Sequence, residues 1–238
     1  MDHILLVESA TDLCSVEVVD LEGKSKGFLL SDVAKSHDTA LAPMVDEVLK
    51  KSGVGISGLC AVAVSEGPGS YMGLRIGVSL AKGIAYGAGL KLIGVGTLAA
   101  LAQCALDKVG AGSGFTHIVP MIDAGRMEVY TAVYDGACNL LSEQKAEAKI
   151  LDEMSFRDLI STGKVLFTGS GAPKFGKLLQ ETCPEAASKA TFLDISPTAS
   201  GMRYKAIAAF KESRFADLAY FQPFYLKEYI PGKQKKLL

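Results

Sequence analysis

The chain has 238 residues, of which 49% are hydrophobic and 21% are charged, and its formal net charge is −1. This length and composition predict one large or two ordinary folded domains and exclude a disordered chain. The nearly neutral charge argues against a free-standing nucleic-acid-binding protein, because such proteins are usually basic. We therefore expect any contact with RNA to require a second chain.

The cysteines indicate the compartment. They are Cys14, Cys60, Cys104, Cys138 and Cys183. Their odd number and wide spacing predict reduced, buried thiols in a cytoplasmic protein. The N-terminus shows no signal-peptide pattern. The apolar stretch 83–106 contains Lys91 and Gln103, so it is predicted to lie in the protein interior and not in a membrane.

The first part of the chain predicts an alternating α/β lobe. Apolar strand patterns and 3.6-residue periodicity place strands at 4–7, 14–19, 25–30, 59–64 and 92–95, and helices at 37–51, 70–88 and 97–108. Helix 37–51 is amphipathic, with Leu41 on its apolar face, and Gly53 is a plausible stop signal. The order is βββαβαβα.

The second part repeats this outline after a Gly/Ala/Ser run at 110–114. Strands are predicted at 118–122, 126–134, 140–148, 165–167 and near 192, and helices at 156–160, 172–180 and 198–212. We therefore divide the chain into lobes 1–109 and 110–238, with the option that the last residues return to the first lobe. Lys233, Lys235 and Lys236 are interpreted as a solvated tail, with contact to RNA phosphates as the alternative.

One stretch, residues 65–77, organises the first lobe. Gly67, Pro68 and Gly69 end the strand at 59–64 in a tight turn, and Ser70 is a good N-cap for the helix that follows. A strand-to-helix turn of this kind exposes backbone N–H groups at a helix N-terminus, where an anion is favoured.

Small residues recur every four positions along that helix, at Gly73, Gly77, Ala81 and Ala85. Each interior glycine costs roughly 1 kcal/mol relative to alanine. A close helix contact would offset this cost. Two interpretations stay open: the helix packs tightly inside its own lobe, or it receives a helix from another subunit.

The two parts also match at their strand ends. Glu8 and Asp123 each end the first strand of a lobe, and Gly-rich turns follow a later strand at Gly67–Gly69 and Gly169–Gly171. This is the layout of the actin-like, sugar-kinase-like ATPase fold, in which two ribonuclease-H-like lobes hold a nucleotide; we expect the second lobe to be smaller and degenerate. The acids would face a metal ion and the turns the phosphates. The candidate nucleotide-binding residues are Glu8, Gly67, Gly69, Ser70, Asp123, Gly169 and Gly171.

With these motifs in view, the chain resembles the bacterial TsaB family of tRNA threonylcarbamoyladenosine biosynthesis proteins, which is related to the TsaD, glycoprotease-like proteins. The resemblance covers essentially the full length. It is most specific at 67–70 and 73–77, with support from 4–7, 14–16, 37–43, 123–130 and 223–226.

The resemblance implies a non-catalytic scaffold that pairs with and activates the TsaD transferase through helices 37–51 and 70–88. A TsaE ATPase would drive the cycle, and tRNA would be bound only within the complex. The same surface would support a homodimer when the partner is absent. The partner-binding residues would be His37, Leu41, Gly73, Arg75, Gly77 and Ala81.

Catalytic and metal sites are not predicted. A TsaD-type metal site needs two histidines four residues apart, and His37 is followed at that spacing by Leu41. The family usually has Asp where this chain has Glu8, and the longer side chain disfavours a metal-bound nucleotide. We therefore expect no cofactor. The alternative is an ATP-dependent transferase or kinase that binds ATP or ADP with magnesium between its lobes.

Overall fold

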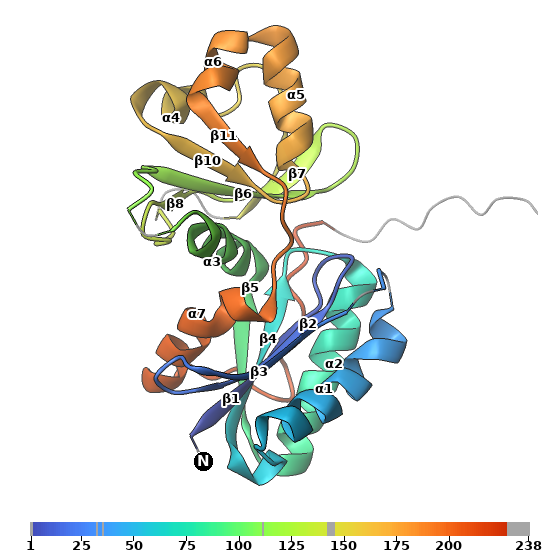
Figure 1. Cartoon of the computed structure of the whole chain (residues 1–238). Coiled ribbons are helices and arrows are strands. Elements are labelled where there is room, and N and C mark those ends of the chain that lie inside the picture. The colour runs from blue at the N-terminus through green and yellow to red at the C-terminus, as the bar shows by residue number, and fades with distance from the viewer. Residues whose placement is uncertain (1, 32, 35, 111, 142–145, 228–238) are drawn as a thin grey trace, which may run out of the picture.

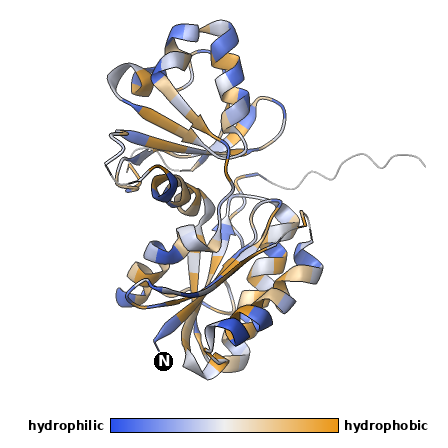
Figure 2. Ribbon diagram, in the orientation of Figure 1, coloured by the Kyte–Doolittle hydropathy of each residue, from blue (hydrophilic) through white to orange (hydrophobic). Residues whose placement is uncertain are grey.

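The computed structural model describes residues 2–31, 33–34, 36–110, 112–141 and 146–227, so the lysine-rich end lies outside the described residues. Two α/β lobes are stacked one above the other (Figure 1). Both sheets are mixed, and hydrophobic residues run along their strands (Figure 2). The α/β fold class expected from the sequence is confirmed.

The first lobe is a five-stranded sheet in the order β3-β2-β1-β4-β5. Its strands are β1 (His3–Glu8), β2 (Ser15–Asp20), β3 (Ser25–Leu30), β4 (Leu59–Gly67) and β5 (Lys91–Gly96). Strands β1 to β3 are antiparallel, whereas β4 and β5 run parallel to β1. One face is covered by α1 (His37–Ser52) and α2 (Tyr71–Ala88), which lie side by side (Figure 1). A short 3-10 turn, η1 (Ile56–Gly58), precedes β4.

The second lobe has six strands, and five of them repeat the first topology. The strands are β6 (His117–Asp123), β7 (Glu128–Thr131), β8 (Tyr134–Asp135), β9 (Glu147–Ile150), β10 (Val165–Thr168) and β11 (Ala190–Leu193). Written as β9-β7-β6-β10-β11, the order matches that of the first sheet, with β8 paired to β6 outside this path. The helices are α4 (Arg157–Thr162), α5 (Ala172–Thr182) and α6 (Pro184–Lys189). The internal duplication predicted from element order is therefore present.

Several predicted elements differ in extent. The strand predicted at 126–134 begins later, at Glu128, because residues 124–127 form a turn in which the Glu128 N–H donates to the Gly125 carbonyl. It is also interrupted at residues 132–133, between β7 and β8. The strand predicted at 140–148 corresponds to β9 only at its end, and residues 142–145 lie outside the described residues. Helix α6 was not predicted from the sequence.

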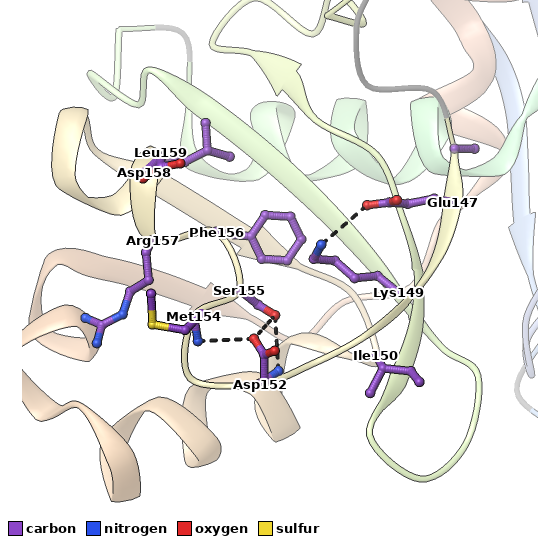
Figure 3. A pocket seen from close by; sticks show the side chains of 11 residues that line it. Glu147, Lys149, Ile150, Asp152, Met154, Ser155, Phe156, Arg157, Asp158 and Leu159 are labelled. Atoms are coloured by element: carbon purple, nitrogen blue, oxygen red, sulfur yellow. Dashed lines mark hydrogen bonds and ion pairs between the residues drawn. The ribbon is translucent and has the colours of Figure 1, made fainter.

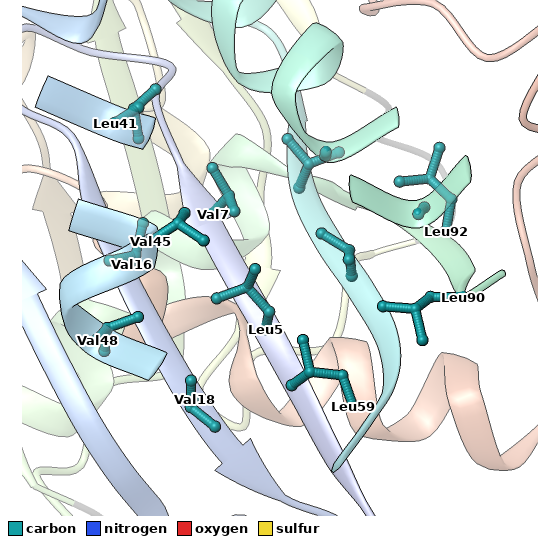
Figure 4. Packing of buried hydrophobic residues seen from close by; sticks show 14 of the residues in the cluster. Leu5, Val7, Val16, Val18, Leu41, Val45, Val48, Leu59, Leu90 and Leu92 are labelled. Carbon is teal, nitrogen blue, oxygen red and sulfur yellow. The ribbon is translucent and has the colours of Figure 1, made fainter. Parts of the chain in front are cut away.

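The apolar face of α1 forms the core under the first sheet. Leu41, Val45 and Val48 point toward strand residues such as Leu5 and Val16 (Figure 4). All five are buried, with Leu41 only 1% exposed. The periodicity that predicted α1 therefore reflects packing within the lobe.

The boundary between the lobes is not where the sequence suggested. Helix α7 (Ala199–Lys211), assigned to the second lobe, packs on the uncovered face of the first sheet through Ala199, Met202 and Ala206. An ion pair between Arg203 and the buried Glu17 of β2 fixes it there, at 2.6 Å. Strand β1 needs an apolar cover on both faces, and α7 supplies the second one. The assignment of all residues 110–238 to the second lobe is therefore wrong for α7.

Helix α3 (Thr97–Val109) lies between the lobes (Figure 1). One side, with Leu98 and Leu101, packs on Ile118 and Leu166 of the second sheet. Its other side meets α7, where a side chain at Gly201 would run into the Ala100 carbonyl. The helix therefore belongs to the cores of both lobes.

The segment 213–227 runs back over the first lobe. Ala216 bridges to Leu92, and the Phe224 N–H donates to the Glu66 carbonyl at 2.6 Å. The Lys82 ammonium donates to the carbonyls of Ala219 and Phe221. This strap, residues 213–227, lies along the edge of the sheet beside α2.

Candidate functional site

The turn from β4 into α2 forms as the sequence predicted. The Ser70 hydroxyl accepts a hydrogen bond from the Gly73 N–H at 3.2 Å, so Ser70 is the N-cap of α2. The Ser70 N–H donates to the Ala10 carbonyl at 2.7 Å. This bond ties the turn to the loop that follows β1.

The small-residue stripe of α2 faces inward. A side chain at Gly73 would run into the Ser9 carbonyl, and one at Gly77 would run into the Ser9 hydroxyl. Ala81 and Ala85 are fully buried. The glycines therefore let α2 approach the end of β1, and the interpretation of this stripe as a surface for a partner helix is wrong.

Most of the predicted partner-binding residues share this position. Leu41 is 1% exposed and His37 is 6% exposed, so with Gly73, Gly77 and Ala81 they are buried inside the lobe. Arg75 is the exception, because it is exposed, stacks on Tyr71 and donates to the Tyr225 hydroxyl at 3.3 Å. The five buried residues cannot be the primary contacts with a partner, because they already pack inside the chain.

A different stripe of α2 faces outward, and the sequence analysis missed it. Met72 is 64% exposed and Tyr86 is 82% exposed, with Ile76, Ser79 and Gly83 between them at three- and four-residue spacing. A side chain at Gly83 would meet nothing within 4 Å. The spacing of Met72, Ile76 and Gly83 could have predicted an exposed face of α2. The four-residue spacing of Gly73 and Gly77 was the more prominent pattern. We call these five residues the outward stripe.

The predicted nucleotide cleft exists as a cavity of about 520 Å³ between the lobes. Loops at the ends of β1, β4, β6 and β10 surround it, together with α3 and the segment before α7. Its lining includes Asp12, Gly69, Ser70, Asp123 and Ser170. The structure therefore brings together Gly69, Ser70 and Asp123 from the candidate set.

The second Gly-rich turn uses two of its N–H groups in bonds within the chain. The Gly169 N–H donates to the Leu193 carbonyl and the Gly171 N–H to the Met121 carbonyl, each at 2.9 Å. Side chains at Gly67 and Gly69 would run into the carbonyls of Phe224 and Ala10. These glycines are needed for close packing of the chain on itself.

The strand-end acids do not form a metal site. Glu8 is fully buried, its Oε1 accepts from the Ala10 N–H at 2.6 Å, and its Oε2 has no partner in the described part of the chain. Burial raises the pKa of Glu8 to about 7. Asp123 is ion-paired with Lys174 at 2.6 Å. Desolvation raises its pKa, but the hydrogen bond from Lys174 and that from the Gly125 N–H outweigh it and leave the pKa lowered.

The residues present therefore do not fit a magnesium nucleotide. Two aspartates, Asp12 and Asp123, line the cleft, and Lys174 is already committed to Asp123. Among the residues that the structure describes, no group of three or more His, Cys, Asp or Glu side chains is arranged to hold a metal ion.

In the described ranges, no helix combines the length and hydropathy needed to cross a membrane.

A larger and more open cavity, of about 680 Å³, lies on the second lobe beside β9 and α4 (Figure 3). Its polar groups bind one another: Asp152 accepts from the Ser155 hydroxyl at 2.7 Å, and Lys149 lies over the Phe156 ring and near Glu147. This cavity therefore offers mostly satisfied groups, and we assign no ligand to it.

The chain is similar to a known protein family and to a known protein over most of its length. The family model described as TsaD, tRNA N6-adenosine threonylcarbamoyltransferase, matches residues 16–236. The Escherichia coli tRNA threonylcarbamoyladenosine biosynthesis protein TsaB is 31% identical over an alignment of 239 positions. This alignment covers 98% of this chain and 100% of that protein.

Solved structures support the fold. YeaZ from Pseudomonas aeruginosa matches with a TM-score of 0.73 at 24% identity, over 95% of this chain and 100% of that one. A dehydratase activator from Clostridium difficile, solved with bound ADPNP, matches with a TM-score of 0.50 at 8% identity, over 89% of this chain and 96% of that one. The chain therefore shares the fold of these solved structures.

The family-model match spans residues 67–77, the stretch on which the resemblance was most specific. The chain belongs to the TsaB family, which takes part in tRNA threonylcarbamoyladenosine biosynthesis.

Proposed function

We propose that the chain is a non-catalytic scaffold subunit of the tRNA threonylcarbamoyladenosine system, which pairs with and activates a TsaD-type transferase through the outward faces of α1 and α2. The outward stripe carries this proposal. It presents exposed Met72 and Tyr86 around Gly83, a helix-interior glycine with no packing role inside the chain.

Gly83 makes α2 less stable than an alanine at the same position would. An interior helix glycine costs about 1 kcal/mol relative to alanine, and Gly83 has no internal contact to offset it. A helix that packs on Gly83 from another chain would offset it and would bury Met72 and Ile76. The homology to TsaD supports a partner built from similar helices.

The remaining assignments follow from this one. The cleft does not fit a nucleotide, so ATP hydrolysis is assigned to a TsaE-type ATPase partner and the transfer itself to TsaD. The net charge of −1 supports tRNA contact only within the assembled complex. A second copy of the chain would use the same stripe when TsaD is absent.

Pairing is tested with Met72→Asp, measured as the dissociation constant for tagged TsaD from the same organism. A charge at the centre of an apolar interface is expected to weaken binding by at least about tenfold. Met154→Asp is the matched control, since Met154 is 66% exposed on the second lobe. Wild-type affinity in Met72→Asp would refute the docking face.

The competing function, an ATP-dependent transferase or kinase, predicts a different result. Calorimetric titration of the purified chain with ATP and magnesium should give no binding heat, because Asp123 is already paired with Lys174 and the described residues form no metal-binding cluster. Micromolar binding with turnover would establish the competing function instead.

A further inference from the structure

A small cavity adjoins the outward stripe. It has a volume of about 310 Å³ and lies between the first turns of α1 and α2 and the loop that follows β1. Its lining residues are Thr11, Asp12, His37, Asp38, Ser70, Met72, Gly73 and Ile76. Met72 and Ile76 belong to both the cavity and the outward stripe, so a chain docked on the stripe would cover the opening.

Two buried polar atoms that line the cavity have no hydrogen-bond partner among the described residues. His37 is 6% exposed, and its Nε2 is buried without a hydrogen bond in the described part of the chain. The Thr11 hydroxyl is buried and equally unpaired there. Asp12 is exposed and forms no ion pair with the residues that the structure describes. A buried polar group without a partner is destabilising, so a bound group that satisfies these atoms would be favoured.

These groups select a hydrogen-bond donor with positive charge. The carboxylates of Asp12 and Asp38 only accept hydrogen bonds, and the Thr11 hydroxyl accepts as well as donates. The Nε2 of His37 accepts in the tautomer that carries its proton on Nδ1. Asp38 uses one oxygen to accept from the Thr39 N–H at 3.0 Å, which leaves the other available. An ammonium or guanidinium group matches this set.

An anion matches it less well. Helix N-termini favour negative charge, and α1 and α2 both begin at this cavity. Asp12 and Asp38 already supply that charge, however, and would repel a second anion at close range. The Gly73 N–H, which an anion would need, is bonded to Ser70.

We propose that this cavity receives the cationic end of a lysine or arginine side chain from the TsaD-type partner, a proposal that rests on the docking face given above. The methylene stem lies against Met72 and Ile76 at the rim, and the charged end reaches Asp12 and Thr11. The volume is roughly ten times that of a liquid water molecule, which is enough for such a side chain.

The test is the affinity of Asp12→Asn for TsaD. Removal of one charge from a pair that becomes buried in an interface is expected to raise the dissociation constant by about thirtyfold or more. Asp194→Asn is the matched control, because Asp194 is an exposed aspartate outside the cavity and the stripe. Thermal unfolding of Asp12→Asn should match wild type, which excludes a folding defect.

The outcomes separate this inference from the docking face. If Met72→Asp loses binding and Asp12→Asn does not, the docking face stands and the cavity assignment is wrong. If neither loses binding, both are wrong.

A second measurement follows the amide signals of Thr11 and His37 by NMR. Ethylguanidinium should shift them and inorganic phosphate should not; the reverse result would make the cavity an anion site and overturn the proposal.

Discussion

Glu8 is a buried acid at the end of the first strand. The residue ends β1, where the fold would place a metal-binding carboxylate, but its side chain is fully buried beneath the loop. Its pKa is raised from 4.5 to about 7 by desolvation. The carboxyl group is therefore a buried, partly protonated hydrogen-bonding group and not a metal ligand.

This shift predicts a pH-dependent stability. Because the folded state binds the Glu8 proton more tightly than the unfolded state, its contribution to stability is fully present below pH 4.5 and is lost as pH rises through 7. The loss should be about 3 kcal/mol. Glu8→Gln keeps an acceptor for the Ala10 N–H and should remove this loss, so urea unfolding should show it more stable than wild type at pH 8. Equal pH slopes for the two proteins would contradict the assignment.

The glycines of α2 should respond in opposite directions. Gly77→Ala places a methyl group against the Ser9 hydroxyl and should destabilise the protein by about 1–3 kcal/mol. Gly83→Ala meets open space and should stabilise it by up to about 1 kcal/mol. Chemical denaturation measures both. The double variant Ser9→Ala/Gly77→Ala should recover part of the loss; equal effects of the two glycine variants would contradict the inward and outward faces.

At the scale of elements, α7 packs on the first sheet through apolar residues and through an ion pair with a buried carboxylate. Glu17 is 1% exposed in its side chain, and Arg203 is its partner. Arg203→Met should therefore cost about 3–5 kcal/mol of unfolding free energy, because it leaves a buried carboxylate unpaired. Adding Glu17→Gln to that variant should restore much of the loss. If Arg203→Met unfolds like wild type, the pair does not fix α7.

The elements themselves were largely predictable from local signals. Ser70 caps α2 and Gly53 ends α1 in the left-handed conformation, so both helices begin and end within about one residue of their predicted bounds. The six-residue helix α6 was missed because its sequence carries little periodicity. The turn after Asp123 was missed because Arg126 adopts a positive φ of 48°, which its residue type does not signal.

Placement in space was less predictable. The stripe of Gly73 and Gly77 gives the same sequence pattern whether it meets Ser9 or another chain, and only the register of α2 on β1 decides between them. The same holds for α7, whose sequence fits the face of either sheet. The unpaired groups of His37 and Thr11 depend on three segments meeting, so no local pattern could reveal them.

At the scale of the whole molecule, the two lobes are joined by shared elements. Helix α3 contributes to the cores of both lobes, and Lys227 of the strap pairs with Glu128 of β7 at 2.5 Å. Aspartates line the cleft between the lobes, and the N–H groups of Gly169 and Gly171 are already bonded within the chain. The partner surface that we propose is therefore the exposed surface of α1 and α2.

The central claim is that this chain acts by docking and not by chemistry of its own. The most direct measurement is the yield of threonylcarbamoyladenosine on tRNA in a reconstituted mixture of TsaD, TsaE and substrates, with wild-type chain, with Met72→Asp and without the chain. We expect modification with wild type, a loss of most of it with Met72→Asp, and none without the chain. Undiminished modification in the mixture that lacks the chain would contradict the account.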